Sequence, residues 1–101
     1  MKEYNKLVRD KIPELIQARG QPCEFHVAAE EEFRQKSIEK VSEEAAEFVR
    51  SPTLDELADL REAVDNAAVA LGSSAEELEQ RRLKKAQERG GFSRRIILER
   101  S

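Results

Sequence analysis

The side chains best suited to chemistry are the carboxylates of the stretch SEEAAEFVRSPTLDELADL, residues 42–60. Glu44 and Glu47 are three residues apart, which puts them on adjoining turns of one helix face. Glu56 and Asp59 have the same spacing. A short turn between two helices makes them antiparallel and brings the two pairs together. Four carboxylates that converge beside apolar surface repel one another and lose hydration unless a cation neutralises them.

Carboxylate oxygens are hard ligands that suit Mg²⁺ or Mn²⁺, ions that keep some waters and bind substrate phosphates at open positions. The spacing therefore predicts a divalent metal site formed by Glu44, Glu47, Glu56 and Asp59. Glutamates stack at four-residue spacing up to Glu47 with no base at that spacing, which favours a bound cation.

An ordinary solvated helix face is the alternative interpretation of these acids. Glu47 could pair with Arg50, and Glu44 with Lys40, and such pairs contribute only about 0.2–0.5 kcal/mol each. Glu56 lies three residues after a threonine and could complete a capping box at the start of a helix. Spacing alone leaves the two interpretations open.

The composition limits the class of protein. The chain has 101 residues, enough for one small domain spanning residues 1–101, and 39% of them are charged. No apolar run approaches the length of a membrane span, and the N-terminus lacks the apolar core of a secretory signal. One cysteine cannot form an internal disulfide, so we expect a cytoplasmic protein. The net charge of −3 argues against a dedicated nucleic-acid binder, and a single histidine excludes a His-rich metal cluster.

Helix signals set the elements that would carry these acids. Asp10 is the expected cap of a short helix that ends at Gly20, and Thr53 and Ser74 are the expected caps of two later ones. The expected helices are residues 10–20, 29–50, 54–71 and 75–89. Alternating or mixed patterns predict short extended segments over residues 22–29 and 92–99.

The two longest expected helices carry apolar stripes at helical spacing. The stripe residues are Ile38, Val41, Ala45 and Phe48 in the first, and Leu57, Leu60, Val64, Ala68 and Leu71 in the second. The predicted fold is therefore all-α: an antiparallel bundle of about four helices, two of them long, with short extended segments near the N- and C-terminal parts.

The chain resembles a known family at several motifs. KVSEEAAEF followed by DELADLREAV resembles the E-E-x-x-E and E-x-x-D signature of the all-α nucleoside triphosphate pyrophosphatase (MazG-like) superfamily. YNKLVRDKIPELI and KAQERGGFSRRIIL are similar to the opening and closing segments of its small, phosphoribosyl-ATP-pyrophosphatase-like members. Together these stretches cover nearly the whole chain.

The resemblance implies a Mg²⁺-dependent hydrolase, with Mn²⁺ as a possible substitute, that acts on a nucleoside triphosphate and could clear non-standard nucleotides. It would cleave between the α and β phosphates and release a nucleoside monophosphate and pyrophosphate. Glu44, Glu47, Glu56 and Asp59 would be the metal ligands, and either Glu43 or Glu47 would accept the proton of the attacking water. The resemblance also implies an oligomer, either a homodimer or a homotetramer.

A triphosphate needs cationic and polar partners, and the family motifs point to particular ones. Asn66 lies on the same face as Asp59 and could contact substrate, or could bond across the helices. The expected substrate-binding residues are Asn5, Lys6, Arg9, Lys11, Asn66, Lys85 and Arg89. The interval between the two acidic pairs is short compared with longer family members, so the base pocket could be open or completed by a second subunit.

Two other functions compete with this interpretation. Phosphoribosyl-ATP pyrophosphatase shares the acidic signature, although the N-terminal and R-G-G-F segments fit it less well. A helical regulatory or interaction module of the same fold without catalysis is the second, but such a module would not need the four acids.

Overall fold

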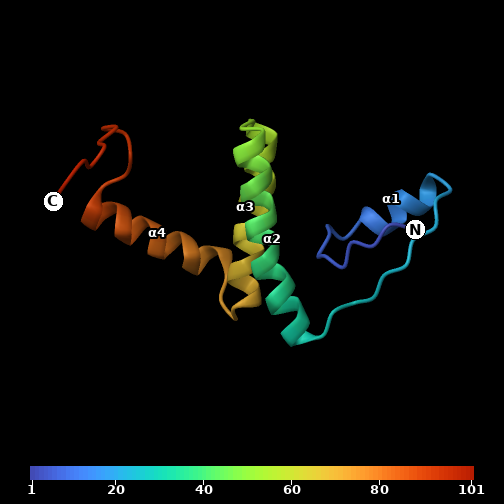
Figure 1. Cartoon of the computed structure of the whole chain (residues 1–101). Coiled ribbons are helices and arrows are strands. Elements are labelled where there is room, and N and C mark those ends of the chain that lie inside the picture. The colour runs from blue at the N-terminus through green and yellow to red at the C-terminus, as the bar shows by residue number, and fades with distance from the viewer.

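The computed structural model describes all residues 1–101 and contains four helices and no strand (Figure 1). The predicted all-α fold is confirmed. The helices are α1 (Ile12–Ala18), α2 (Glu30–Arg50), α3 (Leu54–Ala70) and α4 (Ala75–Arg89). None of them combines the length and the apolar character that crossing a membrane requires.

Helices α2 and α3 form an antiparallel hairpin (Figure 1). They are the only two helices that pack against each other along most of their length. Pro52 disfavours helical geometry at Ser51, which ends α2. The hydroxyl of Thr53 then accepts a hydrogen bond of 3.2 Å from the backbone N–H of Glu56 and starts α3, as its position predicts. This tight turn determines which acidic residues at the end of α2 lie opposite those at the start of α3.

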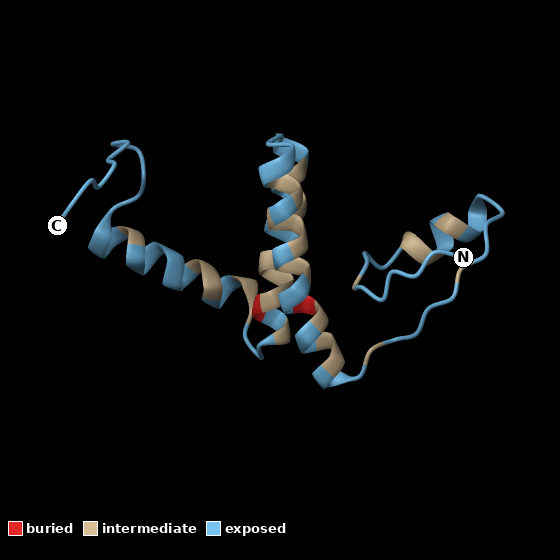
Figure 2. Ribbon diagram, viewed as in Figure 1, coloured by how far each residue is buried: buried red, intermediate tan, exposed pale blue.

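The core of the hairpin is very small. Ser37, Ala63 and Ala68 are the only buried residues, and they lie where α2 and α3 meet (Figure 2). Ser37 is fully buried, and its hydroxyl accepts a hydrogen bond of 2.9 Å from the side-chain amide of Asn66 across the helix pair. Small side chains allow the two backbones to come close, but they leave the larger apolar side chains of both stripes partly exposed.

Helix α4 leaves the hairpin at an angle instead of packing along it (Figure 1). Gly72, with φ of +85°, turns the chain after α3, and the Ser74 hydroxyl accepts a 3.1 Å hydrogen bond from the N–H of Glu77 as expected for a cap. The helix ends at Gly90, where φ is +84°, a backbone conformation that glycine adopts without strain. The result is an elongated molecule of 55 × 31 × 23 Å.

Three local expectations need correction. Asp10 does not cap α1, because the N-cap is Lys11 and no side chain makes the capping hydrogen bond. Residues 21–29 lie as a connector without any partner strand. The C-terminal segment begins with a turn, closed by the 3.1 Å hydrogen bond from the N–H of Arg95 to the carbonyl of Phe92, before it continues without regular structure.

We predict that Ser37→Ala lowers the free energy of unfolding by about 1–3 kcal/mol, because the Asn66 amide loses its partner inside the helix seam. Urea denaturation followed by circular dichroism measures the change. Ser42→Ala removes a hydroxyl from an exposed position of the same helix and should change the value by no more than about 0.5 kcal/mol. Equal effects of the two substitutions would contradict the role of this hydrogen bond.

Candidate metal centre

Three of the four expected metal ligands come together at the turn end of the hairpin. Glu44 of α2 and Glu56 and Asp59 of α3 each offer a carboxylate oxygen, and these oxygens all lie within 4.8 Å of one another. All three residues are partly buried, and the Glu44 side chain is only 14% exposed. The i,i+3 spacing in α3 and the antiparallel pairing produce this convergence.

Glu47, the fourth expected ligand, lies outside the cluster. Its carboxylate forms an ion pair with Arg50 one turn later on the same helix. This is the pairing that the solvated-face interpretation predicts, and it shows that two acids three residues apart need not point to one place.

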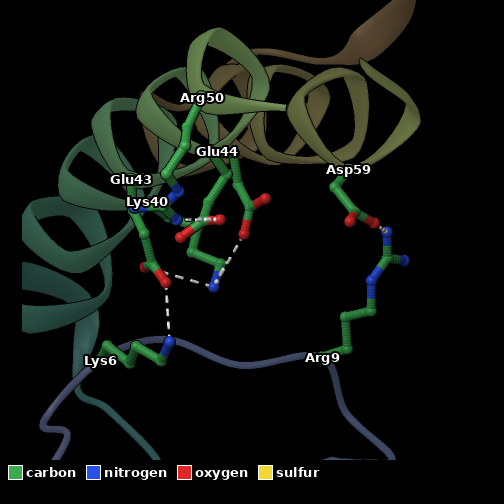
Figure 3. A network of polar contacts seen from close by, with 8 residues as sticks. Lys6, Arg9, Lys40, Glu43, Glu44, Arg50 and Asp59 are labelled. Atoms are coloured by element: carbon green, nitrogen blue, oxygen red, sulfur yellow. Dashed lines mark hydrogen bonds and ion pairs between the residues drawn. The ribbon is translucent and has the colours of Figure 1, made fainter. Parts of the chain in front are cut away.

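Glu43 is held by two lysines (Figure 3). Its carboxylate accepts a 2.7 Å hydrogen bond from Lys6 and a 3.3 Å one from Lys40. Burial raises the pKa of Glu43, but the hydrogen bond from Lys6 and the charge of Lys40 act against it, and the pKa lies below its ordinary value. The same hydrogen bond raises the pKa of Lys6. Both groups are therefore charged at neutral pH.

The N-terminal segment lies across the acidic ends of both long helices (Figure 3). Lys6 reaches α2 at Glu43, and Arg9 reaches α3, where its guanidinium donates a 2.9 Å hydrogen bond to Asp59 and lies 3.6 Å from Glu62. Of these two residues, both assigned to substrate phosphates by the sequence, Arg9 thus meets the candidate metal ligand Asp59, and Lys6 meets the candidate proton acceptor Glu43. In this arrangement they neutralise carboxylates.

The other expected substrate-binding residues do not reach the cluster. Lys85 and Arg89 lie on α4, which follows the C-terminal end of α3 (Figure 1). That end of α3 is about 16 Å from Asp59 along the helix axis. Asn66 bonds to Ser37, which is the cross-helix alternative, and Lys11 is exposed without an ion pair. Asn5 has φ of +48°, a left-handed conformation that asparagine tolerates better than most residues.

Two charged residues beside the cluster have roles that the metal-site interpretation did not assign. Lys40 is only 17% exposed and lies 3.2 Å from Glu44 as well as 3.3 Å from Glu43, so it joins the cluster to its neighbour. Glu62 is the second partner of Arg9. The solvated-face interpretation did predict the pairing of Lys40 with Glu44 from their four-residue spacing, whereas the contact of Glu62 with the distant Arg9 has no local sequence signal.

Comparisons of the chain with models of protein families, with curated proteins and with solved structures found no match. The resemblance to the MazG-like superfamily therefore stays a prediction from the motifs of the chain.

We predict that the native protein binds Mn²⁺ and that Glu44→Gln weakens this binding at least about tenfold, since one anionic ligand is lost. Isothermal titration calorimetry measures both affinities. Asp55→Asn removes a charge from the same turn of α3 but outside the cluster, and should leave the affinity within about twofold. Equal weakening by both substitutions would mean that the ion is attracted by the overall negative charge of this region and is not ligated by Glu44.

Arg9→Met should tighten Mn²⁺ binding, because Asp59 then no longer has a positively charged partner that competes with the ion. We expect a gain of about threefold or more in the same titration. Arg81→Met removes an exposed arginine from α4 and serves as the matched control. Unchanged or weaker binding in Arg9→Met would show that the guanidinium does not compete with the metal.

Proposed function

We propose that this chain is a Mg²⁺-dependent nucleoside triphosphate pyrophosphohydrolase that cleaves between the α and β phosphates. The observation that carries the proposal is the convergence of Glu44, Glu56 and Asp59 from two helices within 4.8 Å. The family motifs quoted above supply the reaction class. Arg9 of the N-terminal motif bonds to Asp59, and Lys6 bonds to Glu43 beside the cluster.

The donor set fits a divalent cation of the Mg²⁺ type. Glu44, Glu56 and Asp59 offer oxygen atoms only and leave room for waters and phosphate oxygens at the remaining positions. When bound there, the ion would polarise phosphoryl oxygens and make a bound water more acidic. Glu47 would have to turn away from Arg50 to join the other three as a ligand.

The basic residues of the N-terminal segment are suited to hold the polyphosphate. Lys6 and Arg9 carry charged groups at the edge of the acid cluster, and each is partly exposed. A cation bound among the acids would weaken the hold of Asp59 on Arg9, and the guanidinium would then be free to donate two parallel hydrogen bonds to a phosphate. The segment would exchange carboxylate partners for phosphate partners as substrate binds.

Of the two candidate proton acceptors, Glu47 suits the role better than Glu43. Two lysines hold Glu43, and its pKa lies below the ordinary value, which makes it a weaker base. Glu47 has one partner, Arg50, at an exposed position, so its carboxylate can be released at small cost. We therefore assign the proton acceptor to Glu47 and a supporting, lysine-binding role to Glu43.

A substrate panel tests the proposal. The purified protein is given standard, deoxy and modified nucleoside triphosphates and phosphoribosyl-ATP, with and without Mg²⁺, and pyrophosphate release is measured. We expect release from at least one triphosphate that depends on Mg²⁺. Preferred turnover of phosphoribosyl-ATP would favour the related biosynthetic activity, and no release from any compound would favour the non-catalytic module.

Substitutions in the cluster then separate chemistry from folding. Glu44→Gln and Asp59→Asn should each reduce turnover at least about a hundredfold, because each removes a metal ligand, while helix content by circular dichroism stays unchanged. Asp55→Asn is the matched control and should retain turnover. If either cluster variant kept the native rate, the ligand assignment would be wrong.

A further inference from the structure

Tyr4 is an aromatic side chain that the fold leaves largely exposed. It is the only tyrosine of a chain that has no tryptophan, and 62% of its surface is accessible to solvent. It lies in the N-terminal segment that also carries Lys6 and Arg9, the two basic residues that reach the acidic ends of α2 and α3. Tyrosine combines an apolar ring with a polar hydroxyl and is enriched where proteins contact their ligands and partners.

Two ammonium groups lie against the Tyr4 ring. The Nζ atoms of Lys2 and Lys6 are 5.2 and 5.5 Å from the ring centroid, which is within the range of cation–π contacts. The same Nζ atom of Lys6 donates the 2.7 Å hydrogen bond to Glu43. A single ammonium group therefore separates the aromatic ring from a carboxylate beside the acid cluster.

This order of groups matches the order of parts in a nucleotide. Phosphates bound at the acid cluster and at Arg9 would place the sugar, and then the base, away from the cluster along the N-terminal segment. A phosphate that draws Lys6 toward itself also draws the ammonium group away from the Tyr4 ring. The ring face that Lys6 leaves is then open to another planar ring, and every base has a π-face that can stack on it.

We propose that the Tyr4 ring stacks on the base of the bound nucleotide and is the contact by which the protein distinguishes a nucleoside triphosphate from inorganic polyphosphate. Stacking uses the face of the base and not its hydrogen-bonding edge. The contact therefore accepts purines and pyrimidines, and it tolerates bases whose edges are modified. This inference rests on the proposed pyrophosphohydrolase function, because that function supplies the nucleotide.

Binding of two matched ligands in the presence of Mg²⁺ tests the base contact. One is α,β-methylene-ATP, which cannot be cleaved between the α and β phosphates, and the other is inorganic tripolyphosphate, which has no base. Isothermal titration calorimetry should show that Tyr4→Leu weakens binding of α,β-methylene-ATP at least about fivefold and leaves that of tripolyphosphate within about twofold. Tyr4→Phe keeps the ring and should retain the native affinity for both ligands.

A second exposed aromatic residue provides the control. Phe92 is 99% exposed in the C-terminal segment, and Phe92→Leu should leave both affinities native. Weaker binding of α,β-methylene-ATP in Phe92→Leu and not in Tyr4→Leu would move the stacking contact to Phe92 and overturn the proposal. Equal weakening of both ligands by Tyr4→Leu would also overturn it, because Tyr4 would then act only by holding Lys6 in place.

The Tyr4 ring itself provides a direct readout. Because the chain has one tyrosine, selective labelling of tyrosine gives a single set of ring resonances in the NMR spectrum. Stacking on adenine should shift these ring protons upfield when α,β-methylene-ATP is added, and tripolyphosphate should leave them nearly unchanged. Equal shifts with the two ligands would contradict a contact with the base.

These measurements separate the base contact from the proposed function. If the native protein binds both ligands in the presence of Mg²⁺ but Tyr4→Leu binds α,β-methylene-ATP with native affinity, the stacking proposal is wrong and the proposed function stands. If the native protein binds neither ligand, both proposals are wrong.

Discussion

The close approach of α2 and α3 is the constraint on which the remaining structure depends. Alanines and a buried serine at the seam let the backbones meet, and the Ser37–Asn66 hydrogen bond satisfies the polar groups placed there. The turn capped by Thr53 then fixes the ends of the helices. Because of this register, acids separated along the chain converge into a cluster, and a looser seam would let them separate into water.

The negative charge of the cluster can be neutralised in two ways, by basic side chains of the chain or by a bound cation. Without a bound cation, Lys40 and Arg9 neutralise Glu44 and Asp59, and Lys6 neutralises Glu43, whereas Glu56 has no ion pair, so the repulsion among the acids is compensated in part. A divalent ion would supply the same compensation and release basic side chains that suit phosphate. The exposed position of Arg9 keeps the exchange inexpensive, since ion pairs accessible to water contribute about 0–1 kcal/mol.

Local signals in the sequence predicted most of the fold. Features that depend on contacts between distant residues were not predicted. The caps at Thr53 and Ser74 and the stop at Gly90 involve only neighbouring residues, so these helix ends were predicted within a residue or two. The partner of a long charged side chain is different, because several lie within reach on a helix surface: Glu47 found Arg50 instead of the other acids. The direction of α4 depends on contacts between elements, which periodicity does not encode.

The small core and the acid cluster are connected by the helices that they share. The buried alanines Ala63 and Ala68 lie in the C-terminal half of α3, and Glu56 and Asp59 lie in its N-terminal half opposite Glu44 of α2, so both depend on the same α2–α3 register. Any ion or partner that binds only the native hairpin would stabilise this register by mass action. It would thereby hold the carboxylates of Glu44, Glu56 and Asp59 together against their mutual repulsion. With only three buried residues, the chain has little packed core to oppose this repulsion, so the ion pairs that Lys40 and Arg9 form with Glu44 and Asp59 carry much of that task.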